Sequence, residues 1–370
     1  MSQDISKIDK NLAISTSLDL PDVKFYDSRD EVFDIYGLYK PHEGTQYRRL
    51  PMDVASSVSD GVAFLSKQTA GGRLRFSTDS EYVAIKATLP DASRMSHMTA
   101  VGAFGFDLYE DSAPECGKVS YFRGSYIPWI TVNEFESVIH FGTRKKRYFT
   151  LNFPLYGGVG DLYIGLQNDA TLDSGRKYSN RRPVMYYGSS ITQGGCASRP
   201  GNSYQGFVSR SLDLDFINFG FSGSGKAEEP MVDYLCSLDM SVFVADYDHN
   251  APDAEYLAPT ALNMYKKLRA AKPDMPYIMM SRPDFHRGID TPHSKESIDR
   301  RQAIIDAYNY ARAEGDENVY FIDGEGMFRG DYECDCTVDG NHPNDLGFSR
   351  MAKVVEATLR RVMMRSNILD

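Results

Sequence analysis

The fold of this chain is decided by the stretch Pro-Val-Met-Tyr-Tyr-Gly-Ser-Ser-Ile-Thr-Gln-Gly, residues 183–194. Its apolar run, 184–187, predicts a buried strand that stops at Gly188, and two serines follow in a polar loop. Glycine tolerates backbone angles that strain other residues, so Gly188 allows a sharp turn. Open α/β sheets hold reactive side chains where their strands end, so either Ser189 or Ser190 is expected to face solvent above the sheet. Taken alone, the two serines indicate only a polar turn.

Downstream of this stretch, short apolar runs alternate with helical patterns. Strands are predicted at 184–187, 216–219, 242–245, 277–280 and 319–322, and helices at about 255–271 and 295–313. A last amphipathic helix is predicted to begin near Asn344. This alternation predicts an α/β domain over 183–370, with a parallel sheet covered by helices on both faces.

The part of the chain before residue 173 has a different pattern. Over 21–172 apolar and polar residues alternate, as in Arg73-Leu-Arg-Phe76, and turn residues separate the runs. A period of two predicts strands with one buried face, and no helical period is evident here. We therefore expect an antiparallel, jelly-roll-like β-sandwich, with a lead-in at 1–20 and a polar linker at 173–182.

Composition excludes several classes of function. The chain has 370 residues, enough for two domains, and its net charge of -10 argues against a nucleic-acid partner. It has no run of about 18 apolar residues, so neither a transmembrane helix nor a membrane partner is expected. The five cysteines are odd in number and scattered, and the N-terminus lacks the apolar core of a secretion signal. These features predict a cytoplasmic protein.

Three further loops follow predicted strands, and each offers a group that acyl transfer uses. Glycines in 218–225 allow backbone N–H groups to face a developing negative charge, and the side-chain amide of Asn250 is a neutral donor. Asp339 precedes His342 by three residues, so its carboxylate can bond Nδ1 and leave Nε2 to accept a proton from serine. Singly, each loop could be an ordinary turn. Together, on an α/β pattern, they indicate a hydrolase.

In this order the motifs resemble the SGNH (GDSL-type) hydrolases, whose first block Gly-Asp-Ser-Ile-Thr is matched by Gly-Ser-Ser-Ile-Thr at 188–192. The resemblance implies a flavodoxin-like, three-layer sandwich. It also implies a catalytic triad of Ser190, His342 and Asp339, and an oxyanion hole made by Ser190, Gly223 and Asn250. No metal or cofactor is implied, and the seven histidines are not expected to form a metal cluster.

Two departures from the family pattern bear on these assignments. Ser189 stands where the family usually has an Asp that braces the loop, so how this loop is held stays open. His249, next to Asn250, is an alternative base, but we prefer His342, which follows Asp339 by three residues in the loop before the last helix.

The sequence Gly-Phe-Asp-Leu-Tyr at 105–109 is similar to the Gly-x-Asp-Leu-Tyr signature of β-sandwich domains that precede some SGNH esterases. Relatives with this layout act on small acyl esters, several of them on acetylated carbohydrates. The resemblance therefore implies a serine esterase whose substrate is a small-molecule or oligosaccharide acyl ester. An acyltransferase using the same acyl-enzyme, and a carbohydrate-binding protein with an inactive hydrolase domain, are the alternatives. A homo-oligomer is left open.

Other residues allow two interpretations. Arg199, just beyond the nucleophile loop, could contact a hydroxylated or anionic substrate or form a surface salt bridge. Trp129 and the tyrosines of the first domain could bind sugars, although such residues more often pack. The stretch 281–294, with His286 and His293, could form an active-site rim or a solvated loop.

Overall fold

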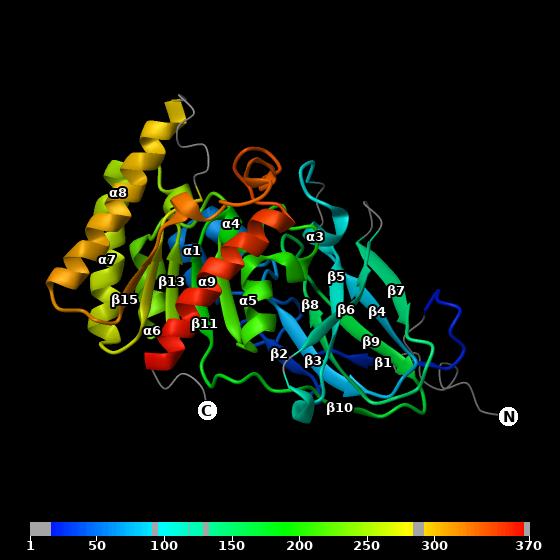
Figure 1. Ribbon diagram of the computed structural model, residues 1–370. Coiled ribbons are helices and arrows are strands. Elements are labelled where there is room, and N and C mark those ends of the chain that lie inside the picture. The colour runs from blue at the N-terminus through cyan, green and yellow to red at the C-terminus, as the bar shows by residue number, and fades with distance from the viewer. Residues whose placement is uncertain (1–15, 91–94, 118, 129–132, 284–291, 366–370) are drawn as a thin grey trace.

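The structure is a computed structural model that describes residues 16–90, 95–117, 119–128, 133–283 and 292–365. Two antiparallel sheets form the N-terminal part and one parallel sheet forms the C-terminal part (Figure 1). In the view of Figure 1 the parallel sheet and its helices lie on the left and the sandwich lies on the right. The predicted combination of an α/β domain with an antiparallel β domain is confirmed.

The sandwich consists of a four-stranded and a six-stranded sheet. The first has the order β1 (Val23–Asp27), β9 (Leu162–Gln167), β4 (Tyr82–Thr88), β7 (Glu134–His140). The second has the order β10 (Leu172–Ser174), β3 (Arg73–Thr78), β8 (Arg147–Asn152), β5 (Phe106–Asp111), β6 (Ser120–Tyr126), and β2 (Asp34–Tyr36) also pairs with β3. Buried apolar side chains such as Phe76 and Ile85 form the core between the sheets.

The parallel sheet has the strand order of the flavodoxin-like fold. It runs β12 (Phe216–Gly220), β11 (Val184–Gly188), β13 (Val242–Asp246), β14 (Tyr277–Met280), β15 (Val319–Ile322). Gly188 lies opposite Gly220 on one side and Asp246 on the other, so three strands end level with one another. The loops after these strands therefore meet at one edge of the sheet.

Helices cover both faces of this sheet. They are α4 (Ser190–Gln193), α5 (Tyr204–Leu212), α6 (Glu229–Ser237), α7 (Ala254–Ala271), α8 (Pro292–Ala313) and α9 (Asp345–Arg365), with short 3-10 turns η3 (Pro200–Asn202), η4 (Asp248–Asn250), η5 (Gly324–Gly326) and η6 (Glu333–Asp335). Tyr186 packs in one core with α5 and α9, whereas its neighbour Tyr187 packs in another with α6 and α7. This alternation along β11 produces the three layers.

The expectation that the N-terminal part lacks helices was wrong. It contains α1 (Met52–Val58), α2 (Asp60–Leu65) and α3 (Ala100–Phe104), besides the 3-10 turn η2 (Pro114–Cys116). These helices are at most two turns long, which is too short for a 3.6-residue period to stand out. α2 and α3 are instead set by their N-caps, because Ser59 and Thr99 accept hydrogen bonds from backbone N–H groups of the first turn.

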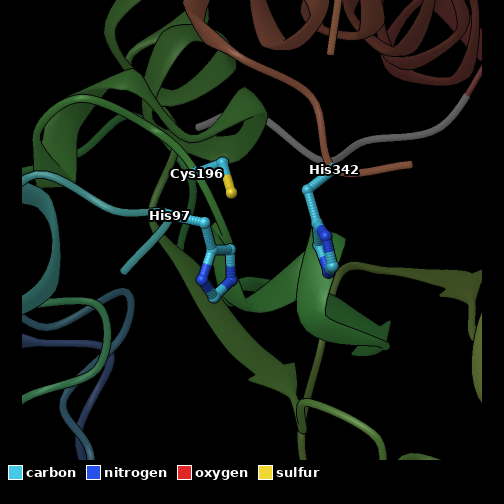
Figure 2. A group of neighbouring side chains, drawn as sticks. All are labelled: His97, Cys196 and His342. Carbon is cyan, nitrogen blue, oxygen red and sulfur yellow. The ribbon is translucent and has the colours of Figure 1, made fainter. Parts of the chain in front are cut away.

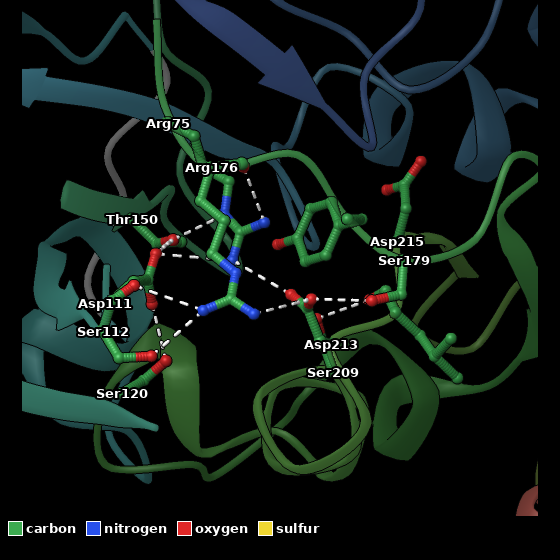
Figure 3. Close-up of polar contacts among 12 residues, drawn as sticks. Arg75, Asp111, Ser112, Ser120, Thr150, Arg176, Ser179, Ser209, Asp213 and Asp215 are labelled. Atoms are coloured by element: carbon green, nitrogen blue, oxygen red, sulfur yellow. Dashed lines mark hydrogen bonds and ion pairs between the residues drawn. The ribbon is translucent and has the colours of Figure 1, made fainter. Parts of the chain in front are cut away.

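The expectation of one buried face was also wrong for β3, because all six of its residues are buried. The arginine face of β3 packs against the C-terminal domain. Arg73 pairs with Asp215 and donates to the Phe216 carbonyl at 2.9 Å, and Arg75 lies 3.5 Å from Asp213. Figure 3 shows Arg75 and Arg176 between Asp111 of the sandwich and Asp213 of the other domain. The arginine face of β3 therefore suggests solvent exposure from its sequence, but it is buried between the two domains.

Arg49 connects the same two domains elsewhere. Its fully buried guanidinium donates hydrogen bonds to four backbone carbonyls, those of Leu65 and Gln68 in the first domain and of Asn218 and Gly220 in the second. Burial lowers the pKa of Arg49 to about 9. Because Asn218 and Gly220 lie at the end of β12 and Leu65 ends α2, the arginine fixes the end of that strand against this helix.

The predicted linker is in contact with both domains. β10 covers its first residues, the Arg176 carbonyl accepts a hydrogen bond from Arg75 at 2.9 Å, and the Asn180 amide donates to the Asp215 carbonyl at 3.0 Å. At the other end of the sandwich, Thr16 and Ser17 from the predicted lead-in bond to Glu136. Across the described ranges, no helix has the length and apolar character that crossing a bilayer requires.

Candidate active site

The loop that follows β11 is a tight turn that Ser189 holds. Ser190 is the first residue of α4 and Ser189 is its N-cap. The Ser189 hydroxyl accepts a hydrogen bond from the Ile191 N–H at 3.1 Å, and the Ser189 N–H donates to Thr192 Oγ1 at 3.1 Å. This reciprocal capping supplies the brace that an Asp usually gives in the family motif. At Gly188 a Cβ would lie 2.0 Å from the Asp246 carbonyl oxygen, so only glycine fits there.

His342 and Asp339 lie in the loop that leads into α9. A bridge between Thr337 and Pro343 closes this loop. One oxygen of Asp339 accepts hydrogen bonds from the backbone N–H groups of Asn341 and His342 at 3.0 and 2.7 Å, and the other lies 2.7 Å from His342 Nδ1. Partial burial raises the pKa of Asp339, but these hydrogen bonds outweigh it and lower the pKa to about 2. The carboxylate is therefore ionised at neutral pH and orients the imidazole.

The structure brings this histidine to the second serine of the loop. His342 Nε2 lies 2.9 Å from Ser190 Oγ, which is a hydrogen-bond distance. Ser190 as a whole residue is only 9% exposed. The side chain of Ser189 is fully buried. By contrast, burial lowers the pKa of His249 well below its ordinary value, and its Nε2 is buried with no hydrogen-bond partner in the described part of the chain.

The three predicted oxyanion donors follow β11, β12 and β13. Gly223 has a φ of +68° with open space where a side chain would begin, and no described residue accepts a hydrogen bond from its N–H or from that of Ser190. The Asn250 amide donates one hydrogen bond to the Phe221 carbonyl at 2.8 Å, which keeps it at the glycine loop and leaves its second N–H. These groups can donate to a negatively charged oxygen bound between the loops.

Two polar residues under the loop that follows β11 did not emerge from the sequence. Asp246 ends β13 and accepts hydrogen bonds from Thr192 Oγ1 at 3.0 Å and from the Tyr204 hydroxyl at 2.9 Å. Gln193 accepts from the Ser222 N–H at 3.0 Å and donates to the Leu155 carbonyl of the sandwich at 3.1 Å. A polar residue that closes an apolar strand, as Asp246 does, is a signal that could have been used.

An open pocket of about 610 Å³ adjoins this site. It is lined by residues 96–99 of the sandwich domain and by Cys196, Ser198 and residues 344–346 of the other domain. His97 and Cys196, which line this pocket, lie beside His342, with one nitrogen or sulfur atom of each within 4.8 Å of the others (Figure 2). The N-terminal domain therefore contributes directly to the surroundings of the histidine.

Comparison with known proteins identifies both halves of the chain. Residues 181–360 match the GDSL-like Lipase/Acylhydrolase family, and residues 23–172 match the GxDLY family, the N-terminus of SGNH-hydrolase-type esterases. The chain belongs to the SGNH (GDSL-type) hydrolases. The resemblance drawn from the sequence motifs is confirmed, and this SGNH hydrolase is a carboxylic ester hydrolase by family.

Solved structures show the same two-domain fold. A protein from Bacteroides ovatus assigned as a GDSL-like lipase is 28% identical, with a TM-score of 0.83 over 92% of this chain and 98% of that one. The salicylyl-acyltransferase SsfX3 of a tetracycline biosynthetic pathway is 17% identical, with a TM-score of 0.73 over 93% and 98%. An acetyl xylan esterase from Butyrivibrio proteoclasticus is 14% identical, with a TM-score of 0.55 over 92% and 98%. A search of curated proteins found no match.

The remaining candidate residues of this SGNH hydrolase lie elsewhere. Arg199 pairs with Asp107 at 3.4 Å and bonds the Tyr109 hydroxyl, so the Gly-x-Asp-Leu-Tyr signature holds it. Arg199 therefore forms a salt bridge, but with a fully buried partner and not at the surface as expected, and a substrate contact by Arg199 stays a prediction. Trp129, His286 and the side chain of His293 lie outside the described residues.

Proposed function

We propose that this SGNH hydrolase is a serine esterase that removes small acyl groups, acetyl in the first place, from carbohydrates. The observation that carries the proposal is the chain of contacts from Ser190 Oγ to His342 Nε2, at 2.9 Å, and from His342 Nδ1 to Asp339, at 2.7 Å. A hydroxyl, an imidazole and a carboxylate in this order can activate a serine for attack on a carbonyl carbon.

In the proposed mechanism, Ser190 Oγ attacks the ester carbonyl while His342 Nε2 takes its proton. Asp339 stabilises the imidazolium, and the N–H groups of Ser190, Gly223 and Asn250 bind the oxyanion. His342 then gives the proton to the departing alcohol, which leaves an acyl-enzyme. Water, deprotonated by the same histidine, releases the acid and restores the Ser190 hydroxyl. His342 returns the proton to Ser190 Oγ, and the acid product loses its own proton to solvent, so side chains and backbone N–H groups supply every step of the proposed mechanism.

The substrate part of the proposal rests on likeness of fold. The acetyl xylan esterase shares both domains of this chain, and the pocket between 96–99 and Cys196 is open enough for a hydroxylated alcohol to enter. The second candidate is an acyltransferase, because the salicylyl-acyltransferase has the higher TM-score of these two neighbours. An alcohol in place of water would then take the acyl group. An inactive hydrolase domain in a carbohydrate-binding protein is disfavoured by the arrangement around Ser190.

Replacing each serine in turn tests the mechanism. Ser190→Ala removes the proposed nucleophile and should abolish hydrolysis of p-nitrophenyl acetate. Ser189→Ala removes only a cap, typically about 1 kcal/mol of local stability, and should keep at least a few per cent of the rate. Rates are measured at a temperature at which thermal unfolding shows that both variants are fully folded. Equal loss of activity in both variants would contradict the assignment of Ser190.

Labelling and product analysis separate the candidates. A fluorophosphonate should label the wild type and Ser189→Ala but not Ser190→Ala, whereas an inactive domain would not be labelled at all. The enzyme is then incubated with acetylated xylo-oligosaccharides, with and without an added sugar whose hydroxyl groups can accept the acetyl group. Free acetate in both cases supports the esterase, and transfer of acetyl to the added alcohol supports the acyltransferase.

A further inference from the structure

Three side chains of the types that bind transition metals come from distant parts of the chain and lie close together beside Ser190. His97 belongs to the sandwich domain, Cys196 follows α4, and His342 precedes α9. One nitrogen or sulfur atom of each lies within 4.8 Å of the corresponding atoms of the other two (Figure 2). The two imidazole rings are 5.7 Å apart between centroids. Two imidazoles and a thiolate are ligands that Zn²⁺ prefers.

The spacing of these atoms is close to that of a metal site. Ligands of a tetrahedral zinc ion lie roughly 3.3–3.8 Å apart, given bond lengths of about 2.0–2.3 Å. The cluster therefore needs to contract by about 1 Å. His97 is exposed and can rotate, whereas Cys196 is buried in the loop after α4. His342 is already oriented by Asp339, the carboxylate–histidine arrangement that supports metal ligands in proteins.

We propose that His97, Cys196 and His342 form an inhibitory site for a thiophilic divalent cation, with Zn²⁺ as its reference ion. The inhibition, though not the binding, rests on the proposed role of His342 as the base. A metal on Nε2 occupies the lone pair that accepts the Ser190 proton, and a metal on Nδ1 displaces Asp339. Either contact prevents the first step of ester hydrolysis.

Binding involves no change of oxidation state. The Cys196 S–H bond breaks, its proton passes to solvent, and a sulfur–metal bond forms. Water completes the coordination, so three protein ligands suffice. Because His97 comes from the sandwich, the cation would link the two domains at the active site. Free zinc would then switch the enzyme off, and a chelator would restore it.

The test uses the full-length protein freed of metal with a chelator and then titrated with ZnCl2. Calorimetry should show one zinc ion bound per chain, and hydrolysis of p-nitrophenyl acetate should fall with the same midpoint and return on adding EDTA. Loss of a group that only supports a ligand costs about 10- to 100-fold in metal affinity, so loss of a ligand should cost at least as much. His97→Gln and Cys196→Ser should therefore each weaken zinc binding at least about tenfold.

Control variants isolate the site. His140→Gln changes an exposed histidine at the end of β7 and should leave zinc affinity unchanged. Mg²⁺, which prefers oxygen ligands, should not inhibit. Each variant's rate is expressed relative to its own metal-free rate, and thermal unfolding confirms that it is folded.

Binding and catalysis are read separately. Ser190→Ala should bind zinc as the wild type does, so calorimetry tests the site even if the proposed function fails. Equal zinc affinity in the wild type, His97→Gln and Cys196→Ser would overturn the site. Binding that depends on both ligands but leaves hydrolysis unaffected would overturn the inhibition and count against His342 as the base.

Discussion

At the scale of the residue, the buried carboxyl group of Asp246, beneath the loop that follows β11, has a raised pKa. Burial is the main cause and the nearby Asp248 the second, and together they raise the pKa to about 7, although hydrogen bonds from Tyr204 and Thr192 oppose the shift. One of its oxygens is buried with no partner in the described structure. In the folded protein the Asp246 carboxyl group is therefore mainly protonated below pH about 7, whereas in the unfolded chain it ionises near the ordinary pKa of 3.8.

This difference predicts how stability changes with pH. Because the folded pKa is raised, the contribution of Asp246 is fully present below pH about 4 and is lost as pH rises through 7. At about 1.4 kcal/mol per pKa unit, the loss is on the order of 4 kcal/mol at most. Asp246→Asn stays neutral and should not show it. The unfolding temperature of the variant minus that of the wild type should therefore increase by a few degrees between pH 4.5 and 8.

An exposed residue provides the control for this pH effect. Asp239 is 74% exposed at its side chain, so Asp239→Asn should show a nearly constant difference over the same range. A difference for Asp246→Asn that does not change with pH would mean that Asp246 is ionised in the folded protein.

Some candidate residues of the site can be proposed from the sequence and others cannot, for a physical reason. Ser190, Asp339 and His342 belong to short local motifs, and the structure places these three side chains within hydrogen-bond distance of one another in a chain. His97 and Cys196 have no such motif, because their partners lie in other loops and only the docked domains bring them together. The sequence shows that Ser189 replaces the usual Asp of the family motif. Only the backbone geometry shows that Ser189 caps α4.

At the scale of the element, apolar strands were predicted well, whereas the burial of a strand with a charged face was not. β14 and β15 have the bounds expected from their apolar runs. β3 was misread because charged residues on a strand ordinarily face water, yet Arg73 and Arg75 meet carboxylates of the other domain. Pattern alone does not tell a solvated charge from one that is paired across an interface.

The contact between β5 and η3 contains another charged residue that is buried at the interface between the domains. Asp107, fully buried in the Gly-x-Asp-Leu-Tyr signature, accepts hydrogen bonds from the Gly201 N–H at 2.8 Å and from the Asn152 amide at 2.6 Å through different oxygens. Asparagine keeps only one acceptor oxygen, so Asp107→Asn leaves one of these buried donors unpaired. We expect a loss of about 1–3 kcal/mol in the free energy of unfolding.

Chemical denaturation measures this loss. Asp239→Asn breaks an exposed ion pair with Arg182 and should cost at most about 1 kcal/mol. Asp107 holds Gly201 of η3, and the chain runs from Ser190 in α4 directly to η3. A loosened η3 should disturb the position of Ser190, so the Asp107 variant should also show a lower kcat. If Asp107→Asn were as stable as Asp239→Asn, the signature would not hold the two domains together.

At the scale of the whole molecule, the two domains share their cores. Leu74 of the sandwich belongs to one apolar cluster with Val184 and Phe216 of the parallel sheet. Leu50 and Leu65 belong to a second cluster with Met185 and Phe219 on the other face. The sequence predicted two units because its periodicity changes near residue 183, but periodicity does not report which surfaces the units bury against each other.

Shared cores predict that the chain folds as one cooperative unit. Calorimetry of the full chain should show a single transition, with the van't Hoff enthalpy close to the calorimetric enthalpy. A fragment of residues 181–370 would lose Arg73 from the face of the Phe216 ring and leave Asp213 and Asp215 without their sandwich arginines. It should aggregate or lack a cooperative transition, and it should not hydrolyse p-nitrophenyl acetate. Two separate transitions in the full chain, or a folded and active fragment, would show that the sandwich only adjoins the catalytic domain and does not complete it.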